Sequence, residues 1–105
     1  MQEEVELMVK YLDEKFGKAK KYRFSEDKYA YHIIAWYKGA PVPNGLMCFD
    51  EERGIFGGRK VFCYDEVEGR KMSVLLQISK RGVDMVLVSL FKPNAPVVWP
   101  PRPLK

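Results

Sequence analysis

Histidine and cysteine are scarce in this chain, which limits the chemistry it can perform. Its 105 residues include one histidine, His32, and two cysteines, Cys48 and Cys63. A single histidine excludes multi-histidine metal sites, and the HExxH, GxSxG and clustered Cys/His patterns are absent. His32 lies among isoleucine and tryptophan residues, so we interpret it as a hydrogen-bonded core residue. We expect no metal, no cofactor and no catalytic residue.

The two cysteines lie in predicted strands and lack CxxC spacing. This pattern indicates two buried, reduced thiols. A disulfide between them is the alternative, and it requires that their strands be neighbours.

Long apolar runs are also missing. No run approaches the roughly 18 residues of a membrane span, and the acidic start Met1-Gln2-Glu3-Glu4 does not resemble a signal peptide. We therefore expect no membrane partner and a cytoplasmic location. The hydrophobic content of 47% and the charged content of 30% are ordinary for a soluble globular protein, and the length suits one domain.

The stretch Lys60–Phe91 predicts three antiparallel strands joined by two tight turns. Glu68-Gly69 fits a two-residue hairpin loop, and Lys80-Arg81-Gly82 fits a three-residue loop that pairs Ser79 with Val83. This register gathers most aliphatic side chains on one face: Val61, Cys63, Met72, Val74, Leu76, Val86, Val88 and Leu90. A one-residue slip would mix the two faces, so the aliphatic face is the predicted core.

The opposite face of these strands mixes apolar with polar side chains. A sheet with one solvated face normally alternates more cleanly, so we expect a cover over its centre. The candidates are the chain's own tail, a second subunit, a ligand or a nucleic acid. The candidate interface residues are Phe62, Tyr64, Leu75, Leu87 and Trp99.

The first part of the chain predicts an amphipathic helix over Gln2–Phe16, ended by Gly17. Its apolar stripe consists of Val5, Met8, Val9, Leu12 and Phe16, widened by Leu7 and Tyr11. We expect this stripe to pack on the aliphatic face of the sheet, with a partner surface as the alternative.

A basic run follows the helix. It is interpreted either as a solvated helix end whose cations complement the dipole or as a phosphate-contacting patch. Tyr29–Tyr37 predicts an interior strand whose tyrosines are core residues or, if exposed, stack on unpaired bases. The candidate nucleic-acid-binding residues are Lys20, Lys21, Arg23, Tyr31 and Arg81.

Two further segments are rich in turn residues or proline. In the middle of the chain, Leu46–Phe49 and Ile55-Phe56 predict a small hairpin across Asp50–Arg53. Five of the seven prolines fall in residues 93–105, which predicts an extended tail. Pro100–Lys105 has a PxxP spacing with a trailing cation, the pattern that aromatic grooves bind. Because such short patterns arise by chance, we expect instead that Val97, Val98 and Trp99 fold back and cover the mixed face, in the same chain or in a partner.

The sequence therefore predicts an α+β domain over residues 1–92, with an N-terminal helix packed on an antiparallel sheet of about five strands, and a proline-rich tail over residues 93–105. We expect a non-catalytic binding module that self-associates, as a homodimer, through a sheet face or the tail. One alternative is a single-stranded nucleic-acid-binding protein, to which the net charge of +4 lends weak support. The other is a small carboxylate- or Mg²⁺-dependent hydrolase built on Asp50, Glu51, Glu52, Asp65, Glu66 and Glu68.

Overall fold

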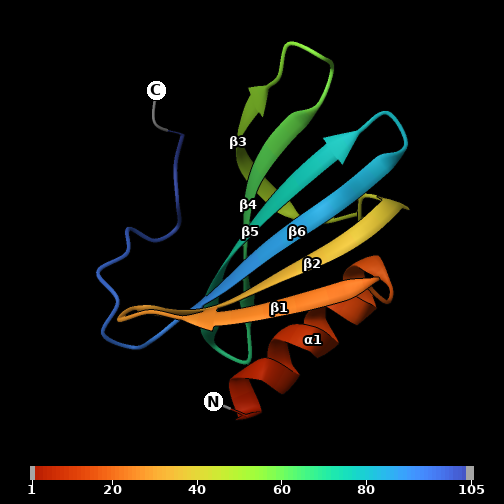
Figure 1. The fold of residues 1–105 in the computed structure, drawn as a ribbon. Coiled ribbons are helices and arrows are strands. Elements are labelled where there is room, and N and C mark those ends of the chain that lie inside the picture. Colours follow the sequence, from red (N-terminus) through yellow and green to blue (C-terminus); the bar gives the residue numbers. More distant parts are fainter. Residues whose placement is uncertain (1, 104–105) are drawn as a thin grey trace.

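A computed structural model describes residues 2–103, which form one helix and one six-stranded antiparallel sheet (Figure 1). The elements are α1 (Gln2–Phe16), β1 (Lys21–Glu26), β2 (Ala30–Ala40), β3 (Met47–Arg53), β4 (Arg59–Val67), β5 (Arg70–Ser79) and β6 (Gly82–Phe91). The strand order is β1-β2-β6-β5-β4-β3. The predicted α+β class is confirmed, with six strands in place of about five. Leu104 and Lys105, the end of the PxxP segment, lie outside the described residues.

The hairpin predicted across Asp50–Arg53 is misplaced. These acidic residues belong to β3, and the turn lies at residues 54–58 instead. β3 is an edge strand, where charged side chains are common because they protect the unpaired edge. A run of charged residues therefore resembles a turn in the sequence although it is a strand in the structure.

The register of the central strands agrees with the prediction except at one turn. Leu76 pairs with Val86 as expected, but Ser79 pairs with Gly82 and Ile78 with Val83. The turn thus contains two residues, not three. Asp84 is the additional, unpaired residue of a β-bulge in β6. Because of this bulge, the predicted register holds again from Met85 onward.

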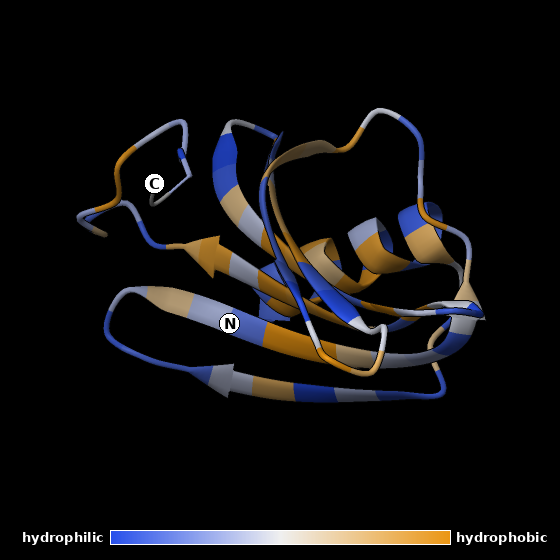
Figure 2. Cartoon of the chain, turned by 90° about the horizontal axis from the view of Figure 1, so that it is seen from above, coloured by the Kyte–Doolittle hydropathy of each residue, from blue (hydrophilic) through white to orange (hydrophobic). Residues whose placement is uncertain are grey.

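The core lies between α1 and one face of the sheet. Figure 2 shows the mixture of orange and blue stretches along α1 that marks an amphipathic helix. The centre of its stripe is fully covered, since Met8 and Leu12 are 0% exposed. These side chains pack with the buried aliphatic residues of the sheet, including Ile33, Val74 and Leu76. Val5, at the margin of the predicted stripe, is only partly buried.

Cys48 and Cys63 are paired residues of β3 and β4, and a disulfide joins them. The interpretation as two reduced thiols was wrong, because β3 lies beside β4 at the edge of the sheet. Disulfides persist mainly in oxidising compartments, so a redox measurement bears on the predicted cytoplasmic location.

Within residues 2–103, no helix is both long enough and apolar enough to cross a membrane.

Candidate functional site

The candidate site is the face of the sheet that points away from α1, here called the open face. Residues paired on neighbouring strands point to the same side, so its side chains form cross-strand rows. The first row is Lys21, Trp36, Met85, Gln77, Lys60 and Glu52. The second row is Arg23, Ile34, Leu87, Leu75, Phe62 and Asp50. The third row is Ser25, His32, Ser89, Ser73, Tyr64 and Met47. Each row crosses all six strands, from β1 to β3.

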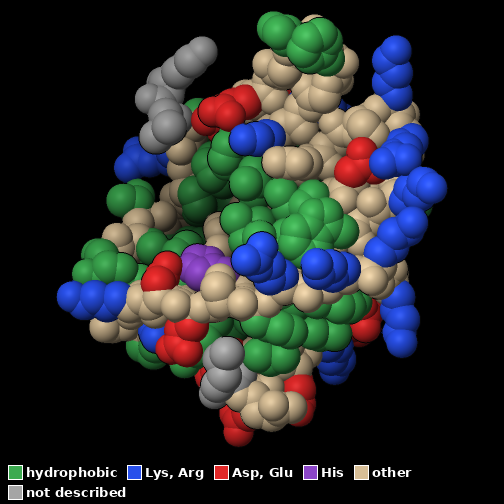
Figure 3. Space-filling model, in the orientation of Figure 1, with side chains coloured by type: hydrophobic (Ala, Val, Ile, Leu, Met, Phe, Trp, Pro, Cys, Tyr) green, Lys and Arg blue, Asp and Glu red, His purple; other side chains and the backbone are tan. Residues whose placement is uncertain are grey.

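The centre of the open face is apolar and only partly covered. Leu75 remains partly exposed, whereas its neighbour Leu76 on the opposite face is 0% exposed. Figure 3 shows an apolar patch at the centre of this face, with Lys and Arg side chains below it and along its right margin. Three of the predicted interface residues, Phe62, Leu75 and Leu87, lie side by side in the second row.

The other two predicted interface residues contact each other at one end of this face. The rings of Trp99 and Tyr64 meet edge to face, with their centroids 5.3 Å apart. The Lys71 Nζ lies 5.7 Å from the Trp99 ring centroid. The tail therefore contacts the open face at Tyr64 in the third row, and the side chains of the first two rows are at least partly exposed.

The two edges of the open face carry opposite charges. Lys21 and Arg23 lie on β1, and Asp50 and Glu52 lie on β3. Within residues 2–103 none of these four side chains forms an ion pair. Lys21 Nζ instead lies 5.6 Å from the Trp36 ring centroid. In the second row the charge thus runs from basic at β1, through an apolar centre, to acidic at β3, and the first row has the same charged ends with Lys60 beside Glu52.

The structure brings together some of the predicted nucleic-acid-binding residues. Lys20 precedes β1, and its backbone N–H donates to the Trp36 carbonyl oxygen, so it adjoins Lys21 and Arg23. Arg81 lies in the β5–β6 turn, where its Nε is 3.0 Å from the Asp84 Oδ1.

Tyr31 does not join these cations. It packs against the core on the helix side of the sheet, with the Lys92 Nζ 4.9 Å from its ring centroid. The aromatic residue that does lie beside the cations is Trp36. Alternation along β2 divides aromatic residues between the two faces, but the sequence did not show which of the two sets lies on the side that α1 covers.

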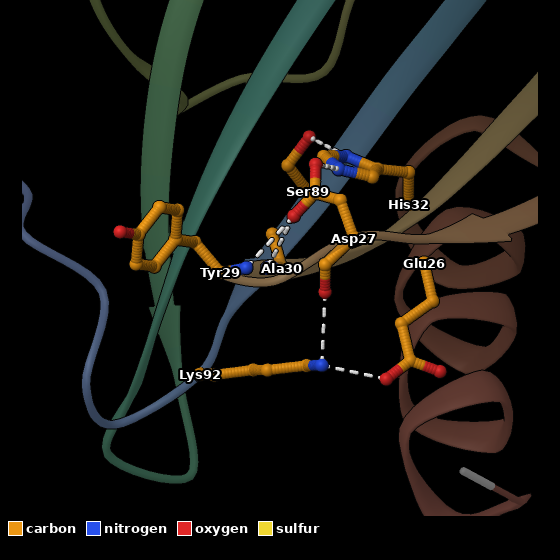
Figure 4. Close-up of polar contacts among 7 residues, drawn as sticks. All are labelled: Glu26, Asp27, Tyr29, Ala30, His32, Ser89 and Lys92. Atoms are coloured by element: carbon orange, nitrogen blue, oxygen red, sulfur yellow. Dashed lines mark hydrogen bonds and ion pairs between the residues drawn. The ribbon is translucent and has the colours of Figure 1, made fainter.

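A polar chain on the open face was not predicted (Figure 4). The Nδ1 of His32 lies 2.7 Å from the Ser89 Oγ, and the Nε2 of His32 lies 2.7 Å from the Asp27 Oδ2. The other Asp27 oxygen, Oδ1, accepts hydrogen bonds from the backbone N–H groups of Tyr29 and Ala30. Because an ionised carboxylate only accepts hydrogen bonds, the Nε2 of His32 carries the donated proton. His32 is thus hydrogen-bonded as expected, although it lies on the open face.

This chain fastens the β1–β2 turn to β6. The hydrogen bond from His32, followed by those from the two backbone N–H groups, lowers the Asp27 pKa from 3.8 to about 2. Ser89 is only 6% exposed, in the interior of the sheet, which leaves little room for a substrate at its hydroxyl group. Lys92 Nζ adds a second connection by donating to the Glu26 Oε2 and the Asp27 carbonyl oxygen.

A second surface feature lies at the β3–β4 turn, where Ile55 and Phe56 are 92% and 93% exposed. A hollow of about 550 Å³ adjoins them, and Arg53, Arg59 and Ile78 contribute to its lining. No group of three or more His, Cys, Asp or Glu side chains within the described part of the chain could hold a metal ion.

Comparisons with protein-family models, with curated proteins and with solved structures find no match for this chain.

Proposed function

We propose that this chain is a non-catalytic binding module that acts through its open face, and that it self-associates there. The observation that supports this proposal is the partly exposed apolar centre of the first two rows, which includes Trp36, Leu75 and Leu87. Contiguous exposed apolar surface rimmed by polar residues is typical of interaction sites. Covering this patch with an equivalent patch would remove apolar area from water on both copies.

Size-exclusion chromatography with light scattering, over a range of protein concentrations, tests the self-association. We expect a mass that rises toward that of a dimer, and we expect Leu87→Lys to abolish the rise because it places a charge in the centre of the patch. Val42→Lys is the matched control, since Val42 is 48% exposed and lies in a loop outside the sheet. A wild-type protein that stays monomeric at every concentration would refute self-association.

Single-stranded nucleic acid is the second candidate partner. It is favoured by the contact between Lys21 and Trp36, which places a cation beside a partly exposed indole ring. Base stacking on an aromatic side chain is worth about 1–3 kcal/mol per base, and cations add a salt-dependent phosphate contribution. Anisotropy of a labelled single-stranded oligonucleotide, read at two salt concentrations, tests this candidate. An absence of binding at low salt would refute it.

A further inference from the structure

We infer that the open face binds the open face of a second copy about a two-fold axis parallel to the strands, which sets Lys21 and Arg23 of each copy opposite Glu52 and Asp50 of the other. This inference rests on the proposed self-association and specifies its geometry. It follows from the cross-strand rows and from the charges at their two ends.

The axis determines which residues meet. A half-turn about a line that runs parallel to the strands, midway between two facing sheets, reverses the strand order and keeps each row opposite itself. β1 then lies over β3 of the second copy, and β2 over β4 of the second copy. Sheets that pack face to face in this way lie about 10 Å apart, with their strands within about 30° of each other.

The second row is self-complementary under this operation. Arg23 meets Asp50 of the second copy, Ile34 meets Phe62 of the second copy, and Leu87 meets Leu75 of the second copy. Each apolar side chain of the row thus faces another apolar side chain, and each charge faces its opposite. Such reciprocal contacts are characteristic of isologous two-fold interfaces.

The first row also sets opposite charges against each other at its ends, whereas inside them Trp36 and Met85 meet the polar side chains Lys60 and Gln77 of the second copy. Lys21 meets Glu52 of the second copy, and Trp36 meets Lys60 of the second copy. The second of these contacts allows a cation–π interaction in addition to burial of the indole ring. The row therefore contributes ionic contacts between Lys21 and Glu52 at its ends and a contact between Trp36 and Lys60 nearer its centre.

The charges also exclude the other face-to-face two-fold arrangement. An axis perpendicular to the strands would place β1 over β1 of the second copy and β3 over β3 of the second copy. Arg23 would then face Arg23 of the second copy, and Asp50 would face Asp50 of the second copy. Facing like charges oppose association, so the charge pattern selects the axis parallel to the strands.

The four edge charges favour a second copy over a nucleic acid. Asp50 and Glu52 would repel phosphate groups, whereas a second copy pairs both with cations. Within residues 2–103 these carboxylates have no ion-pair partner, so the dimer satisfies charges that one chain leaves unpaired. The six strands span only about 24 Å at about 4.8 Å per strand spacing, which limits the contact area. Since small interfaces are typical of transient complexes, we expect micromolar association.

Two charge-reversal variants test this geometry. The variant K21E/R23E makes both edges of the open face acidic, and D50K/E52K makes both edges basic. Each variant alone then places like charges opposite each other, so we expect its self-association to weaken at least tenfold. An equimolar mixture restores opposite charges at both edges, so we expect a one-to-one heterodimer with an affinity within threefold of the wild type.

Sedimentation equilibrium of each variant and of their mixture measures these affinities, and thermal unfolding checks that both variants are folded. The quadruple variant K21E/R23E/D50K/E52K exchanges the two edges and should self-associate like the wild type. If the wild type associates but both double variants associate equally tightly, or if the mixture forms no heterodimer, the inferred geometry is wrong while self-association stands. If the wild type is monomeric, the proposed self-association itself is wrong. Salt-sensitive oligonucleotide binding by such a monomer, lost in K21E/R23E and strengthened in D50K/E52K, would identify nucleic acid as the occupant instead.

Discussion

The indole ring of Trp99 meets the phenol ring of Tyr64 edge to face, at an interplanar angle of 78°. This contact fastens residues 92–103, which contain neither helix nor strand, to the third row of the open face. Aromatic pairs of this geometry are worth about 0.5–1.5 kcal/mol beyond the area they bury. At the start of the tail the Lys92 backbone N–H donates to the Tyr29 carbonyl oxygen, and farther along the tail the aromatic contact with the sheet is made by the Trp99 side chain.

Replacing that side chain should release the tail. We expect Trp99→Ala to lower the free energy of unfolding by about 1 kcal/mol through the lost ring contact, with a further loss from the area no longer buried. Urea denaturation followed by Trp36 fluorescence measures this change. Val98→Ala is the control, because Val98 is 69% exposed and should cost little. Equal losses in the two variants would show that the ring contact is not what holds the tail.

The disulfide between Cys48 and Cys63 should stabilise the edge of the sheet. It links residues separated by 15 positions. Closing a loop of this length lowers the conformational entropy of the unfolded chain, which stabilises the folded protein by about 3 kcal/mol. We expect a reductant, or the double substitution Cys48→Ser with Cys63→Ser, to lower the urea midpoint accordingly. An unchanged midpoint after reduction would contradict a stabilising role of the disulfide. Free thiols in the purified protein, measured by mass spectrometry, would show that the disulfide does not form and would favour a reducing compartment.

The sequence was sufficient to predict the helix and the central strands because their signals are periodic. The stripe of α1 and the alternation in β4, β5 and β6 each repeat several times, so an error in register would have mixed apolar with polar side chains. The same repeats also indicated which face of the central strands forms the core. The turn after β5 was misjudged because the bulge at Asp84 changes the pairing by one residue without disturbing the pattern beyond it.

The candidate site was harder to predict because it depends on contacts between distant strands. Arg23 and Asp50 lie at the ends of one row only because β2, β6, β5 and β4 are inserted between them in that order. The two tight turns indicate that β4, β5 and β6 are neighbours, but nothing in the local sequence indicates that β2 lies beside β6. The same reason hid the link between Asp27 and Ser89, which meet through His32 although they are far apart in the chain.

Gly82 should tolerate no side chain. It has a φ of 128°, and a Cβ placed there would lie 2.6 Å from the Ala40 carbonyl oxygen and 2.9 Å from the Gly39 carbonyl carbon. We expect Gly82→Ala to lower the thermal midpoint much more than Gly69→Ala does. Gly69 has a φ of 74° but no atom within 4 Å of the position that a Cβ would take. The Gly69→Ala control therefore reports the backbone strain alone, and the additional loss in Gly82→Ala reports the steric clash. Similar midpoints for the two variants would refute the close approach of β2 to the β5–β6 turn.

The fold should lose stability in acid partly through Asp27. Its pKa is lowered from 3.8 to about 2 by the hydrogen bonds it accepts, so its contribution is present above pH 4 and is lost as the pH falls toward 2. We expect Asp27→Asn to be less stable than the wild type at pH 7, with a difference that shrinks between pH 4 and pH 2. Thermal unfolding across this pH range measures the difference, with Glu14→Gln on the exposed side of α1 as the control. A difference that is constant with pH would show that the carboxylate charge at Asp27 does not contribute.

Leu75 and Leu76 provide the most direct test of the two faces, because they are neighbours that point in opposite directions. Leu76 is 0% exposed in the core, so we expect Leu76→Ala to cost about 2–5 kcal/mol of unfolding free energy at any protein concentration. Leu75 lies in the second row and is partly exposed, so we expect Leu75→Ala to cost less than about 1.5 kcal/mol in dilute solution, below the usual range for a core leucine. Chemical denaturation at low protein concentration measures both losses, and light scattering at high concentration should show weaker self-association for Leu75→Ala. A loss at Leu75 as large as that at Leu76 in dilute solution would mean that the monomer already covers this face, leaving no apolar surface for a second copy to bind.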